Sequence, residues 1–85
     1  MPQVARIGDG ISHGGAIIEG SPDVFANGIA VARLGDKVMC QIHGLRVISS
    51  GSETVSANGK PVARIGDSIS CGAVIVEGSP DTEAG

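Results

Sequence analysis

Four residues in this chain of 85 have the chemistry of metal ligands: two cysteines and two histidines. Three of them, His13, Cys40 and Cys71, each stand nine residues after the start of a hexapeptide that recurs three times. The fourth, His43, follows Cys40 by three residues. Two thiolates and two imidazoles suit Zn²⁺, which structural sites hold with four protein ligands in a tetrahedron. We therefore predict one zinc site formed by these four side chains.

Other roles for the same residues stay open at this point. Cys40 and Cys71 could form a disulfide, or they could be inert core thiols, and the histidines could bond backbone groups in turns. The shared register favours the metal site. A site with four protein ligands is closed, whereas catalytic zinc keeps one position open for water. We therefore expect a structural metal ion and no enzyme.

The recurring hexapeptide organises the whole chain. Val-Ala-Arg, then Ile or Leu, then Gly-Asp occurs at residues 4–9, 31–36 and 62–67. The first and third copies align without a gap from Val4 to Asn27, with 16 of 24 positions identical. Such self-similarity indicates a repeat architecture. We predict one domain, residues 1–85, made of three copies at approximately 4–30, 31–61 and 62–85.

An axis of pseudo-threefold symmetry would explain why the ligands share a register. Side chains at equivalent positions of three packed copies converge on the axis, and His13, Cys40 and Cys71 are such a set. The second copy differs by a four-residue insertion between Cys40 and Gly51. His43 lies in or beside that insertion, so the break in symmetry can supply the fourth ligand.

Strands and turns are the elements expected to position these ligands. Apolar alternation over residues 29–34 and 73–76 is typical of short strands. Asn-Gly at residues 27–28 and 58–59 predicts two-residue hairpin turns. No window has the 3.6-residue apolar period of a helix. With one Phe and no Tyr or Trp, the core is thin, and small domains of this kind need a staple. We predict an all-β domain.

Composition excludes several classes of protein. The chain has six basic and nine acidic residues, a net charge of −3, with no basic run and no aromatic set for base stacking, so nucleic acid is not expected as a partner. No apolar stretch approaches the roughly 20 residues of a membrane span, and the N-terminus lacks the pattern of a signal peptide. We expect a soluble protein that is made in the cytoplasm.

Each hexapeptide also pairs an arginine with an aspartate three residues later. The three arginines could form a basic ring for an anionic ligand, or they could pair with carboxylates and cap loop carbonyls between copies. One acid accompanies every arginine, so the structural role is favoured. The carboxylates of Glu19 and Glu77 recur at equivalent positions, and we expect them to be solvated.

The third hexapeptide is preceded by proline, so that Pro61-Val62-Ala63-Arg64 is followed by Gly-Asp two residues later. The His13-Gly14-Gly15 and Cys71-Gly72 turns, the Gly-Ser blocks and Asn58-Gly59 accompany it. With these features the chain resembles the PAAR-repeat family, whose Pro-Ala-Ala-Arg signature is closest at residues 61–64, and the resemblance covers residues 1–85. It implies a small conical β-domain with zinc at its point. Carried over, the zinc ligands are His13, Cys40, His43 and Cys71, with more Cys and fewer His than is usual in the family.

The resemblance also implies a function. The domain would be a non-enzymatic tip that caps a trimeric β-helical spike, of the VgrG type or its phage-tail counterpart, in type VI secretion or a related contractile injection machine. It would be assembled on the spike, ejected with it through the target membrane, and would recruit effectors non-covalently. The third copy stops at Gly85, so no effector extension is expected. A free-standing zinc-stapled binding or carrier module is the alternative. A zinc enzyme on a trimeric β-solenoid is disfavoured by the repeat length of about 30 residues.

Overall fold

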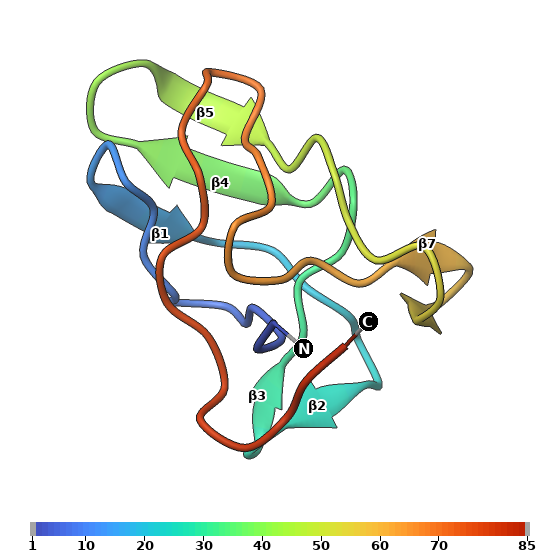
Figure 1. Cartoon of the computed structure of the whole chain (residues 1–85). Helices are drawn as coiled ribbons and strands as arrows, with labels where there is room; N and C mark the ends of the chain where they lie inside the picture. The colour runs from blue at the N-terminus through green and yellow to red at the C-terminus, as the bar shows by residue number, and fades with distance from the viewer. Residues whose placement is uncertain (1, 85) are drawn as a thin grey trace.

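The structure, a computed structural model that describes residues 2–84, is built from short strands and turns (Figure 1). Within those residues there is no helix, and thus none that is long and apolar enough to cross a membrane. The prediction of a small all-β domain is confirmed. The strands are β1 (Gly15–Ile17), β2 (Phe25–Ala26), β3 (Ile29–Ala30), β4 (Lys37–Cys40), β5 (Gly44–Val47), β6 (Ser56–Ala57) and β7 (Lys60–Pro61).

Strand pairing runs around the molecule and returns to its start. β1, β4 and β5 form an antiparallel sheet, with Ala16 opposite Met39 and Met39 opposite Leu45. Beyond β5, the second copy pairs with the third through Ile48 and Ile69, and the third pairs with the first through Ile75 and Ile11. Each copy is therefore hydrogen-bonded to both of the others.

Three backbone hydrogen bonds form a closed circle at the centre of this arrangement. The N–H of Ala32 donates to the carbonyl of Ala5, that of Ala63 to Ala32, and that of Ala5 to Ala63, each at 2.9 Å. All three alanines are fully buried. This ring of three alanines lies on the pseudo-threefold axis, which confirms the predicted symmetry. The methyl side chain follows from the geometry, because three larger side chains would meet there.

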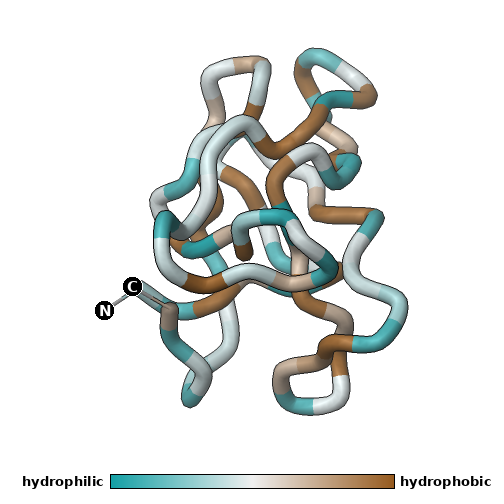
Figure 2. The backbone as a smooth tube through the Cα atoms, turned by 90° about the vertical axis from the view of Figure 1, so that its right-hand side faces the viewer, coloured by the Kyte–Doolittle hydropathy of each residue, from teal (hydrophilic) through white to brown (hydrophobic). Residues whose placement is uncertain are grey.

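Buried apolar side chains form two clusters, and the ring of three alanines belongs to the larger one. One cluster, which we call the base, consists of three valines and three alanines: Val4, Val31, Val62, Ala26, Ala57 and Ala84. The other contains branched aliphatic side chains such as Ile11, Val38 and Ile69, and it extends to Cys40 and Cys71. We call that end the apex. Hydrophobic stretches of the chain cross the middle of the molecule in Figure 2.

Three β-pairs frame the base. The hairpins β2–β3 and β6–β7 turn at Asn27-Gly28 and Asn58-Gly59, where all four residues have φ between 55° and 77°. The two predicted hairpin turns are therefore confirmed. The third β-pair is the bridge between Gln3 and Glu83, which occupies the place equivalent to the two hairpins.

The predicted strands at 29–34 and 73–76 are interrupted. Only Ile29–Ala30 of the first is a strand, and the second is reduced to bridges at Val74 and Ile75. The cause is that the chain changes partner from residue to residue near the axis: Val31 pairs with Arg6, and Arg33 pairs with Val62. Local periodicity does not reveal such exchange.

Candidate metal centre

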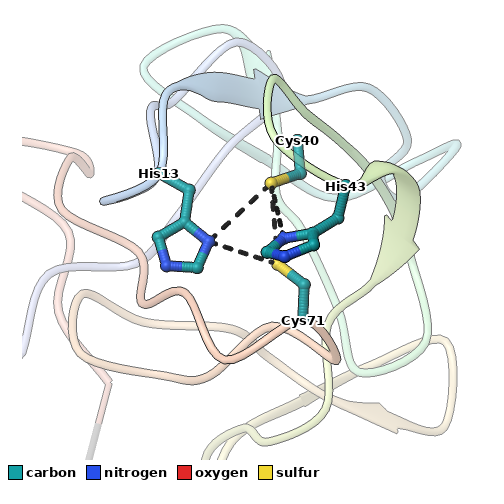
Figure 3. A group of neighbouring side chains, drawn as sticks. All are labelled: His13, Cys40, His43 and Cys71. Carbon is teal, nitrogen blue, oxygen red and sulfur yellow. Dashed lines mark hydrogen bonds between the residues drawn. The ribbon is translucent and has the colours of Figure 1, made fainter.

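The structure brings all four predicted ligands together at the apex. One nitrogen or sulfur atom of each of His13, Cys40, His43 and Cys71 lies within 4.8 Å of the others. The four side chains point toward one another in Figure 3. His13 precedes β1, Cys40 ends β4, His43 lies in the β4–β5 turn and Cys71 lies in a turn of the third copy. The insertion in the second copy lengthens the β4–β5 hairpin, and the turn of that hairpin places His43 beside Cys40.

The spacing of these atoms fits tetrahedral zinc. With Zn–S near 2.3 Å and Zn–N near 2.05 Å, a tetrahedron has a sulfur–sulfur edge of roughly 3.8 Å and sulfur–nitrogen edges of about 3.6 Å. The two Sγ atoms are 3.7 Å apart. Cys40 Sγ lies 3.6 Å from His43 Nδ1 and 3.9 Å from His13 Nδ1, and Cys71 Sγ lies 3.7 Å from His13 Nδ1. These four of the six edges therefore match the size that zinc requires, and the other two are no longer than 4.8 Å.

A disulfide does not explain the two cysteines in this structure. Both are free, and the separation of 3.7 Å between their sulfur atoms far exceeds the bonded distance of about 2.05 Å. Burial raises the pKa of the Cys40 thiol, but hydrogen bonds from the backbone of His43 and Ile42 and from the rings of His43 and His13 outweigh it. The net effect lowers the pKa of Cys40 to about 6. Thiolate is the form that binds metal.

Glycine allows the backbone to come close beside His13. Gly15 has φ +104°, and a Cβ there would lie 1.9 Å from the carbonyl oxygen of Met39, on the facing strand. Gly14 has φ +82°, and a Cβ there would lie 2.6 Å from Oε1 of Gln41. The close approach of the two turns therefore requires glycine at position 15, where the obstacle is backbone, whereas at Gly14 the obstacle is the flexible end of Gln41 and the positive φ is what favours glycine.

Three arginine–aspartate pairs support the copies below the apex. In the tightest pair, Arg33 donates to both carboxylate oxygens of Asp36 at 2.9 and 2.8 Å, and to the carbonyl of Gly20 in the first copy at 3.3 Å. The other two arginines repeat this pattern: Arg6 reaches Asp9 and the Gly78 carbonyl, and Arg64 reaches Asp67 and the Gly51 carbonyl. The structural role expected for the arginines is confirmed.

Glu19 and Glu77 are exposed loop residues, as expected, and each also accepts a backbone hydrogen bond from another copy. Oε1 of Glu19 accepts the backbone N–H of Lys37 at 3.1 Å, and Oε1 of Glu77 accepts that of Gly10 at 2.7 Å. In the second copy a hydroxyl does the same work, since Ser50 Oγ accepts the N–H of Ser68. Each acceptor ties its own copy to the next, a long-range contact that the repeat alone does not reveal.

Two side-chain hydrogen bonds between asparagine and aspartate at the base were also not predicted from the sequence. Nδ2 of Asn58 donates to Asp23 at 2.8 Å, and Nδ2 of Asn27 donates to Asp81 at 2.7 Å. These contacts hold the pKa of Asp23 and of Asp81 below the ordinary value of 3.8. The recurrence of Asn-Gly together with Ser-Pro-Asp was the available signal.

A family model described as the PAAR motif matches residues 4–77. The matched region includes the three hexapeptides and all four candidate ligands. Comparison with curated proteins gives no match.

Proposed function

The chain belongs to the PAAR-motif family, a family of structural spike-tip modules of contractile injection machines such as type VI secretion, and we propose that it acts as one. In this role it caps a trimeric β-helical spike of the VgrG type or its phage-tail counterpart. The base contacts the spike and the apex points away from it.

One observation carries this proposal: a single chain presents three equivalent β-pairs around one axis. A spike of three identical chains ends in a threefold face with unpaired strand edges, which would aggregate if they stayed open. The pairs β2–β3, β6–β7 and Gln3–Glu83 surround the base at equivalent positions. One copy of this chain can therefore cover all three edges of such a face at once.

Zinc would complete the tip. His13, Cys40, His43 and Cys71 would hold it, and when bound it would crosslink the three copies at the apex. Since all four ligands come from the protein, the site has the closed form of structural zinc. We therefore propose a mechanical role without catalysis, in which the protein is assembled on its spike in the cytoplasm and ejected with it, carrying any effectors non-covalently.

Binding to the spike tests this function. Untagged protein is mixed with a trimeric spike from the same organism, and the complex is analysed by size-exclusion chromatography with light scattering. We expect one chain per spike trimer.

Two exposed apolar residues provide a matched pair of variants. Phe25, on the β2–β3 hairpin at the base, is 57% exposed, and Ile42, at the apex, is 66% exposed. We expect Phe25→Asp to weaken the complex and Ile42→Asp to leave it intact. If neither the native chain nor the apex variant binds the spike, the chain is instead a free-standing binding module. If Ile42→Asp alone abolishes binding, the orientation is reversed.

A further inference from the structure

We propose that Cys40 and Cys71 are an oxidation site, at which a peroxide-class oxidant converts the two thiolates to a disulfide and expels the zinc ion. The proposal depends on zinc binding and not on the spike. Two of the roles open to these cysteines, metal ligand and disulfide partner, then become two states of one site.

The two sulfur atoms already face each other. Their separation of 3.7 Å must shrink by about 1.7 Å to reach bonding distance. Cys71 lies in a turn next to Gly72, outside any strand, so its side chain can move without breaking a sheet. No other cysteine competes, because the chain has only two.

Exposure sets the order of events. Cys71 is partly exposed, whereas Cys40 is only 1% exposed. An oxidant from solvent therefore reaches Cys71 first, and the buried thiolate of Cys40 is the resolving group next to it. Such a pair of accessible and resolving thiols is the usual arrangement of redox-sensitive cysteines.

The chemistry balances with peroxide as the only added reactant. The Cys71 thiolate attacks one peroxide oxygen, an S–O bond forms, the O–O bond breaks and hydroxide leaves. The Cys40 thiolate then attacks the Cys71 sulfur, an S–S bond forms, the S–O bond breaks and a second hydroxide leaves. The thiolates lose two electrons in all, and both hydroxides take a proton from solvent to become water.

Loss of the metal follows from ligand number. A disulfide removes both sulfur ligands, so that only His13 and His43 remain. Structural zinc needs four ligands. A site built from four histidines would not respond in this way, since imidazole does not form such a bond.

The experiment uses the zinc-loaded full chain and hydrogen peroxide. Released zinc is followed with a chromogenic chelator, and the intact mass and a non-reducing peptide map are recorded at each time. We expect one zinc ion lost for each disulfide, a product mass lower than the reduced metal-free chain by two hydrogen atoms, and recovery on adding dithiothreitol and zinc.

The repeat supplies the matched control. His13 occupies the position equivalent to Cys71, so Cys71→His keeps four ligands while removing the pair of thiols. We expect peroxide to release zinc from this variant at least about tenfold more slowly. If the variant does not fold, diamide, which oxidises thiols to disulfides, must produce the same disulfide and zinc loss in the native chain.

Several results would overturn the proposal. They are retention of zinc with intact thiols in peroxide, loss of zinc with oxygen added to sulfur in place of a disulfide, and equally fast release from Cys71→His. Failure to bind zinc would overturn it together with the metal assignment. Spike binding, present or absent, bears only on the proposed function.

Discussion

Replacement of Arg33 by methionine provides the sharpest test of how the copies are held together, because the repeat contains its own control at Arg6. The Arg33–Asp36 pair is the more buried, with side chains 10% and 1% exposed, and its two ion-pair contacts are 2.9 and 2.8 Å. The equivalent Arg6–Asp9 pair is 13% and 10% exposed, with contacts of 3.3 and 3.4 Å. Arg33→Met leaves the Asp36 carboxylate buried without its cation.

The expected cost follows from that difference. Removing one partner of a buried ion pair destabilises a protein by about 3–5 kcal/mol. The longer and wetter contacts of Arg6 resemble ordinary hydrogen bonds to a charged group, so Arg6→Met should cost about 1.5–3 kcal/mol. A gap of about 2 kcal/mol between the two variants corresponds to a difference of about 8–16 °C in Tm for a domain of this size.

Thermal unfolding of the two variants, followed by circular dichroism, measures this gap, because the chain has no Trp or Tyr for fluorescence. Adding Asp36→Asn to Arg33→Met should recover part of the loss. The buried charge is then gone, while a side-chain oxygen at position 36 remains to accept the backbone N–H of residue 33, which donates to Asp36 at 2.8 Å in the native chain. Equal Tm values for Arg33→Met and Arg6→Met, or a further loss in the double variant, would refute the reasoning.

The remaining predictions concern the apex, the base and the axis. His43→Ala should abolish stoichiometric zinc and speed amide hydrogen exchange in the apex turns while the ring of three alanines stays protected; unchanged metal content and exchange would contradict the ligand assignment. Asn58→Gly, which keeps the turn at φ 56°, should raise the pKa of Asp23 toward 3.8, because its largest lowering contact is lost. Since the native pKa is depressed, the stabilisation from this contact is present above pH 3.8 and is lost as pH falls through the lowered value. Carboxyl titration by NMR and urea unfolding against pH check both points, and an unmoved pKa would count against them. Ala32→Val should destabilise the fold by about 1–3 kcal/mol through overpacking at the axis, whereas Ala16→Val should be close to neutral. Valine stands at the position equivalent to Ala16 in the other two copies, and equal denaturation midpoints for the two variants would contradict the packing argument.

Much of the fold could be predicted from the sequence because the three copies keep the same spacing from the hexapeptide to the ligand position. The position of Cys71 nine residues after Val62 predicts its place at the apex, and Asn58-Gly59 predicts its hairpin. Both are consequences of local sequence or of symmetry. The match of the Nδ1 and Sγ spacings to tetrahedral zinc needed coordinates, because it depends on where the longer β4–β5 hairpin places its turn.

Several hydrogen bonds between copies could not be predicted. The carboxylate of Glu19 accepts a hydrogen bond from the N–H of Lys37, which lies on another copy and is a backbone group with no sequence signature. The exchange of strand partners at Val31 was hidden for the same reason. Side-chain patterns indicate which face of a segment is buried, but they do not say which backbone it meets.

The ring of three alanines fixes the number of repeats. In a linear repeat array each unit contacts only its neighbours, so units can be gained or lost one at a time. Here each of Ala5, Ala32 and Ala63 donates to one copy and accepts from the other, so deleting one copy breaks two of the three bonds and a fourth copy has no place in the circle. The circle can therefore accept added residues where the chain turns back at the surface, as in the longer β4–β5 hairpin of the second copy.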